Sequence, residues 1–118
     1  MYRLKEVQEF IDEIGKGSPS NPAMEDMLFK SVGYSQYVGE LENQAETIYA
    51  KKKMECLEKL SKMDDETETT RQAKLNSWTA EEKETWRNLR LMNRNLKTAQ
   101  MSLMVAMKNR REEAFRGT

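Results

Sequence analysis

The feature that most constrains the fold of this chain is a long stretch without glycine or proline. Neither residue occurs between Leu41 and Arg116, whereas four of the five glycines and both prolines lie before residue 40. Because these residues interrupt helices and supply tight turns, a β-rich or loop-rich protein rarely continues so far without them. We therefore expect an all-α protein: a long antiparallel, coiled-coil-like helical hairpin with a short N-terminal helix packed on it.

The N-terminal helix is expected at about residues 3–15 of a single domain that spans residues 1–118. Its apolar side chains recur every three or four residues, which is the spacing of one buried helix face. They are Leu4, Val7, Phe10, Ile11 and Ile14. The Gly, Ser and Pro residues of segment 17–21 predict a loop after this helix.

The second helix is expected at about residues 22–63. Asn21 is suited to cap it and Pro22 to occupy its first position. Gly33 and Gly39 weaken the helix, and they mark either a kink near residues 33–39 or a close approach by another helix. Beyond them one apolar stripe continues at steps of three and four residues. It holds Val38, Leu41, Ala45, Tyr49, Lys52, Cys56, Leu60 and Met63, of which only Lys52 is not apolar.

Residues 64–78 are expected to connect the second helix to the last one. The segment begins with the acidic run DDETETT, and at most a helical turn is expected near its end, with Leu75 and Trp78 facing inward. Thr79 and Glu82 match a capping box, so the last helix is expected at about residues 80–114. Its seam steps by four and three residues. It holds Thr85, Leu89, Met92, Leu96, Ala99, Leu103 and Ala106.

Charge is distributed unevenly along the chain. Residues 1–82 carry 11 basic and 17 acidic side chains, whereas residues 83–118 carry 9 basic and 3 acidic ones. A cationic row on the last helix predicts contacts to nucleic-acid phosphates or to an acidic partner. An alternative is that the row pairs with acidic residues of the second helix, namely Glu40, Glu42, Glu46, Glu55 and Glu58. The row consists of Lys83, Arg87, Arg90, Arg94, Lys97, Lys108 and Arg111.

Apolar residues interrupt this cationic row. Met101 and Met104 take its next two positions, and Leu91 and Val105 lie near them on the helix. Because methionine adapts to irregular surfaces, this patch is a candidate contact for a protein partner. The alternative is that the N-terminal helix covers the patch within the same chain.

The composition gives little support to catalysis. The chain has no histidine, the usual general base near neutral pH, and its one cysteine, Cys56, falls on an apolar stripe. We expect no catalytic residue, cofactor or metal. A remote alternative is a carboxylate-metal nucleotide hydrolase that uses Glu9 with Asp12 and Glu55 with Glu58. Their order differs from that of the all-α nucleotide pyrophosphohydrolases.

The sequence favours binding as the function. We expect a non-enzymatic helical interaction or adaptor protein that binds a macromolecular partner and forms homo-oligomers. In style the small, charge-rich helical chain is typical of phage accessory or regulatory proteins. The alternative is a nucleic-acid-binding protein that uses the basic face of its last helix. No segment approaches the ~20 apolar residues of a membrane span, and no apolar signal region opens the chain, so we expect a cytoplasmic location away from membranes.

Overall fold

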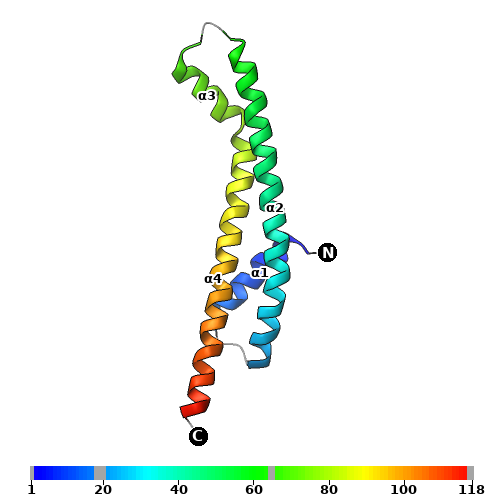
Figure 1. Cartoon of the computed structure of the whole chain (residues 1–118), viewed down its shortest axis with the longest axis vertical. Helices are drawn as coiled ribbons and strands as arrows, with labels where there is room; N and C mark the ends of the chain where they lie inside the picture. The colour runs from blue at the N-terminus through cyan, green and yellow to red at the C-terminus, as the bar shows by residue number, and fades with distance from the viewer. Residues whose placement is uncertain (1, 18–20, 64–65, 117–118) are drawn as a thin grey trace. The chain divides into compact units, whose positions relative to one another are not determined.

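The computed structural model describes residues 2–17, 21–63 and 66–116, and the side chains of all of these except residues 21 and 22. Every regular element in these residues is a helix: α1 (Leu4–Gly15), α2 (Asn21–Ser61), α3 (Glu68–Trp78) and α4 (Ala80–Arg116) (Figure 1). The long helices α2 and α4 pack against each other as a hairpin, and α1 is the short N-terminal helix. The predicted all-α hairpin is confirmed.

The chain divides into two compact units, and the single domain over residues 1–118 stays a prediction. Unit 1 comprises Met1–Gly39 and Leu91–Thr118, and unit 2 comprises Glu40–Arg90. Each unit therefore contains part of α2, part of α4 and one shorter helix, which is α1 in unit 1 and α3 in unit 2.

Unit 1 has its core where α1 meets the two long helices. Val7 and Phe10 are the buried residues of α1, as its apolar spacing predicts, and Phe10 packs against the ring of Tyr34 at a centroid distance of 5.0 Å. Ser31 of α2 is fully buried, and its hydroxyl accepts a hydrogen bond of 2.9 Å from the Gln100 side chain of α4. The buried core residues are Val7, Phe10, Met24, Met27, Val38, Leu96 and Leu103.

Gly33 marks a close approach within unit 1, but by a single side chain and not by another helix as its position predicts. A Cβ atom added at Gly33 would lie 2.5 Å from the hydroxyl oxygen of Tyr2. The Tyr2 ring also packs edge-on against Tyr34, with the ring centroids 5.1 Å apart. The neighbour is thus a side chain that precedes α1, and α2 continues through Gly33 and Gly39 as one helix.

Unit 2 has a smaller core around α3. Cys56 and Leu60 of α2 are buried against Leu75 of α3, with Met63 and Trp78 packed beside them. The inward position predicted for Leu75 and Trp78 is therefore confirmed. The predicted connection over residues 64–78 is wrong for 68–78, because this segment is an 11-residue helix. Residues 64–65 of that connection, and the predicted loop at 18–20, lie outside the described residues.

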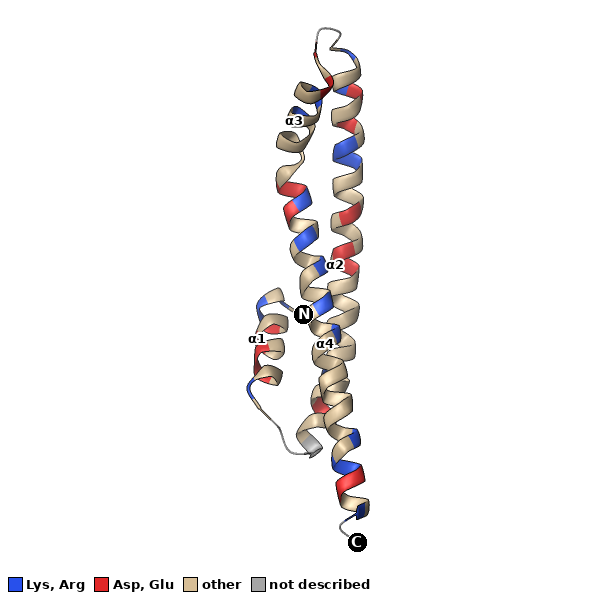
Figure 2. Ribbon diagram, turned by 90° about the vertical axis from the view of Figure 1, so that its left-hand side faces the viewer, with Lys and Arg blue, Asp and Glu red and all other residues tan. Residues whose placement is uncertain are grey.

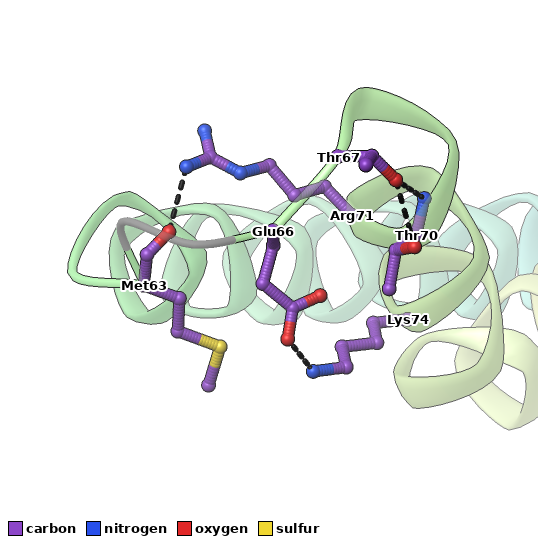
Figure 3. A network of polar contacts seen from close by, with 6 residues as sticks. All are labelled: Met63, Glu66, Thr67, Thr70, Arg71 and Lys74. Atoms are coloured by element: carbon purple, nitrogen blue, oxygen red, sulfur yellow. Dashed lines mark hydrogen bonds and ion pairs between the residues drawn. The ribbon is translucent and has the colours of Figure 1, made fainter.

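Polar contacts tie α3 to the residues that follow the end of α2 (Figure 3). The Arg71 guanidinium donates a hydrogen bond of 2.6 Å to the backbone carbonyl of Met63, and Lys74 forms an ion pair with Glu66. The backbone N–H of Thr70 donates to the Thr67 hydroxyl, which caps α3. A cation at the C-terminal end of a helix also complements the helix dipole. This explains why a segment with few apolar residues is helical.

The start of α4 lies where we expected it, but Thr79 acts differently. Its carbonyl accepts the N–H of Lys83, as the residue before a helix does. Its hydroxyl is buried and donates to the carbonyl of Leu75 at 2.8 Å, so Thr79 closes α3 as well as preceding α4. The capping-box interpretation, in which the hydroxyl serves α4, is replaced by this bond to α3.

Candidate interaction site

The apolar interruption of the cationic row is exposed in the structure. We call Leu91, Met101, Met104 and Val105 the α4 patch. Each of these side chains belongs to unit 1 and is between 52 % and 66 % exposed. Met101, Met104 and Val105 lie within five residues of one another and Leu91 lies ten residues before Met101. Exposed apolar side chains grouped in this way commonly mark an interaction site.

The N-terminal helix leaves the α4 patch uncovered. It packs instead on the face of α4 that carries Asn95, Ala99 and Ser102, where these residues and Thr98 face Ile11, Ile14 and Gly15 across a shallow pocket. The expected alternative, that the first helix covers the patch within the same chain, is therefore wrong. The patch is free to bind another molecule.

Positive charge brackets the part of the α4 patch that contains Met101, Met104 and Val105, whereas Leu91 lies before Lys97. Between Lys97 and Lys108 α4 carries no charged residue, and both lysines are exposed, as is Arg111 one turn further on. Figure 2 shows this uncharged stretch of α4 between two groups of blue residues. This part of the patch thus has an apolar centre with cationic ends, which suits a partner surface that combines apolar groups with carboxylates.

The remaining members of the cationic row lie along α4 before Met101. Lys83 is half-buried, whereas Arg87, Arg90 and Arg94 are exposed. The Arg90 guanidinium lies over the ring of Trp86, 4.9 Å from its centroid, and this contact holds the side chain against the helix surface. Lys83, Arg87 and Arg90 belong to unit 2, while Arg94 begins the part of the row in unit 1.

The predicted internal pairing of the row is not seen for most of the acidic residues of α2. In the described part of the chain, no ion pair joins Glu40, Glu46, Glu55 or Glu58 to a basic residue. Ion pairs that the structure does show include Lys5–Glu9, Lys30–Asp26 and Lys74–Glu66. The exposed cations of α4 therefore remain available to a ligand.

Unit 2 contains a groove between α2 and α4 that sequence reasoning missed. We call it the α2–α4 groove; its volume is about 320 Å³. Ile48 on its wall is 59 % exposed although it is a large aliphatic residue. In the sequence, Ile48 lies beside the apolar stripe of the second helix. That position alone does not indicate a groove. The lining residues are Leu41, Gln44, Ala45, Ile48, Glu81, Glu82, Thr85 and Leu89.

The free thiol of Cys56 lies at a second pocket of unit 2. The side chain is buried, as its place on the apolar stripe predicts. Lys59 lies over the Trp78 ring at 5.3 Å from the centroid, and Lys52 and Glu55 complete the rim. The thiol is thus part of the packing between α2 and α3.

The carboxylates considered for a metal site belong to separate units. Glu9 and Asp12 lie in unit 1, and Glu55 and Glu58 in unit 2. Over residues 2–17, 21–63 and 66–116, no group of three or more cysteine, aspartate or glutamate side chains is placed to hold a metal ion.

Within the described residues, no helix combines the length and the apolar content that crossing a bilayer requires. Comparison with models of protein families, with curated proteins and with solved structures finds no match for this chain.

Proposed function

We propose that this protein is a non-enzymatic helical interaction protein that binds a macromolecular partner through the α4 patch. The observation that carries the proposal is the exposure of Leu91, Met101, Met104 and Val105, which α1 leaves uncovered. Burying a large apolar side chain contributes roughly 1.5–3 kcal/mol when the side chain leaves water entirely. Two or three such residues are sufficient for the centre of a specific interface.

Methionine suits this role because its unbranched side chain adapts to the surface it meets. Met101 and Met104 supply adaptable contacts, and the exposed cations at Lys97, Lys108 and Arg111 supply orientation. Electrostatic complementarity of this kind mainly sets the association rate and the choice of partner. The partner surface is therefore expected to be apolar with an acidic rim.

Substitution of the patch tests this proposal. The triple variant Met101→Ser, Met104→Ser, Val105→Ser should lose the nuclease-resistant partner that the unchanged chain captures from its native cell, or lose self-association in light scattering. A matched control, Phe29→Ser with Val32→Ser, removes exposed apolar residues of α2 and should keep both. Circular dichroism verifies the helical content of each variant. A wild-type chain that is strictly monomeric and captures nothing would contradict the proposal.

A second candidate function is nucleic-acid binding through the cationic row. It is supported by the exposure of Arg87, Arg94 and Lys97, which form no ion pair within the residues the structure describes. Arginine makes forked contacts to phosphate, and affinity based on such contacts falls steeply with salt. The variant Arg87→Glu with Arg94→Glu should abolish binding without loss of helix. Absence of DNA or RNA binding by the wild type at low salt would exclude this function.

A further inference from the structure

We propose that the partner of the α4 patch is a second copy of this chain, which receives the patch in the α2–α4 groove of its unit 2. The inference rests on the proposed function and specifies its partner. Two surfaces carry it, one apolar with positive ends and one apolar with a negative rim. Both are exposed in the same chain, so every copy offers each surface to another.

The groove has the chemistry to receive a basic amphipathic helix. Its apolar lining includes Leu41, Ala45 and Leu89, and Ile48 on its wall is largely exposed. Of the residues that line the groove, the charged ones are Glu81 and Glu82, at the start of α4. Charge on its rim is therefore negative, and it would attract a helix that presents lysine or arginine beside apolar anchors.

The α4 patch presents its anchors at the required spacing. Met101, Met104, Val105 and Lys108 stand at positions i, i+3, i+4 and i+7, which is how a helix lays one face into a groove. The first three are apolar and exposed, and the fourth is an exposed lysine. Arg111 follows one turn after Lys108, so two cations can reach two carboxylates while the apolar anchors enter the groove.

Unit 1 already contains a helix held in this way. In α1 the residues at i, i+3, i+4 and i+7 are Val7, Phe10, Ile11 and Ile14, and they pack between α2 and α4. The surface between the two long helices is thus suited to a third helix with this spacing. In unit 2, α3 packs on Cys56 and Leu60 and does not line the α2–α4 groove.

Charge selects the α4 patch over the α1 helix of a second copy. The solvent side of α1 carries four acidic residues, Glu6, Glu9, Asp12 and Glu13, against one lysine, Lys5, and is therefore negative. These would face Glu81 and Glu82, and like charges placed together disfavour association. The anchors of α1 are also buried or half-buried within its own chain, whereas those of the α4 patch are exposed.

Charge reversal with rescue is the first test, on the full-length chain. Sedimentation equilibrium at an ionic strength of about 0.05 M keeps screening weak. Reversing the groove (Glu81→Lys with Glu82→Lys) or the patch (Lys108→Glu with Arg111→Glu) should each raise the dissociation constant about tenfold or more. The chain with all four substitutions should regain most of the affinity. The control Glu46→Lys with Glu58→Lys makes the same charge change on exposed α2 residues outside the groove and should leave association unchanged.

Cross-linking between copies is the second test, and it reports position independently of affinity. Both chains carry Cys56→Ala; one also carries Ile48→Cys and the other Met104→Cys. A short thiol-specific cross-linker should join the two chains. Replacing the first by a Met54→Cys chain, whose cysteine is on exposed α2 surface outside the groove, should give no product.

The outcomes separate this inference from the proposed function. Association without charge rescue, or cross-linking through Met54→Cys in place of Ile48→Cys, would overturn the groove as the binding site. A wild-type chain that is monomeric at all concentrations would overturn the second copy as the partner. In both cases patch-dependent capture of a different protein, resistant to nuclease, would leave the proposed function standing. Loss of the captured partner with nuclease would favour nucleic acid instead.

Discussion

Unit 1 and unit 2 are built from parts of the same two long helices, yet they treat their third helix differently. In unit 1, α1 contributes Val7 and Phe10 to a core shared with both long helices. In unit 2, α3 contributes Leu75 to a smaller core with Cys56 and Leu60. The difference follows from the third helices themselves, because α1 has apolar residues at every turn whereas α3 has them only near its end.

A pair of long helices can hold a third helix by apolar packing or by polar contacts, and the two units differ in this respect. Apolar packing completes unit 1, and α1 lies beside the face of α4 that carries Asn95 and Ala99, across a shallow pocket. Polar contacts of Arg71 and Lys74 place α3 in unit 2, and the groove beside Ile48 stays open. A third helix placed by polar contacts leaves apolar surface of the pair available for binding.

Core truncation should produce the largest difference between the units. Leu96→Ala in unit 1 removes a fully buried side chain and should cost about 3–5 kcal/mol of unfolding free energy. Leu60→Ala makes the same change in the smaller core of unit 2 and should cost about 2–3 kcal/mol, because a thin core collapses more easily around the cavity. Urea denaturation measures both, and a larger loss for Leu60→Ala would contradict the ranking of the two cores.

Removal of the contact from α3 to the end of α2 should have the next largest effect. Arg71→Met keeps most of the side-chain volume but deletes the hydrogen bond to the Met63 carbonyl. It should cost about 1–2 kcal/mol and make the α3 amides exchange faster, because the bond joins a charged donor to a part-buried carbonyl. Arg94→Met, on exposed α4 surface, is the control and should change stability little. Unchanged α3 exchange would show that apolar packing alone holds the helix.

The polar bond between the long helices of unit 1 should contribute less. Ser31→Ala deletes the acceptor for Gln100 and should cost about 1 kcal/mol. Ser61→Ala is the matched control, since both hydroxyls donate to the carbonyl three residues earlier but Ser61 is exposed. Thermal unfolding of the pair isolates the contribution of the bond to Gln100. Equal melting temperatures would indicate that this bond adds nothing net.

The glycines of α2 should give the smallest effects, with opposite sign. Gly39→Ala places its Cβ in open space and should stabilise the protein by about 0.5–1 kcal/mol, because alanine favours the helix. Gly33→Ala should gain less, because the new Cβ displaces the Tyr2 ring. Chemical denaturation of the two variants gives the difference. A greater gain for Gly33→Ala would mean that Tyr2 does not pack on α2 in solution.

The spacing of apolar residues predicted those helices whose buried faces depend on that spacing alone. Val7 and Phe10 of the α1 stripe and the seam residues Leu96 and Leu103 are buried as their spacing indicates, whereas Leu4 at the start of the stripe is exposed. The helix at 68–78 was missed because its stability depends on contacts eight residues apart, Met63 with Arg71 and Glu66 with Lys74, which no helical periodicity reveals. Thr79 was misread for a similar reason, since two helices compete for its hydroxyl.

The candidate site shows the same division. The α4 patch could be identified because Met101 and Met104 replace charges at regular positions. The exposure of the patch could not be predicted, because the face of α4 on which α1 lies depends on three-dimensional packing. The groove beside Ile48 also required the structure, since its two walls come from segments about forty residues apart in the chain.

Unit 2 contains the side chains that report its unfolding separately from that of unit 1, and one of them is the buried thiol of Cys56. It is the only cysteine in the chain, and both tryptophans, Trp78 and Trp86, also belong to unit 2. Tryptophan fluorescence and the rate of thiol labelling therefore report the opening of this unit alone, while circular dichroism reports every helix. Without any added label, the two signals can tell whether the protein melts in one step or in two.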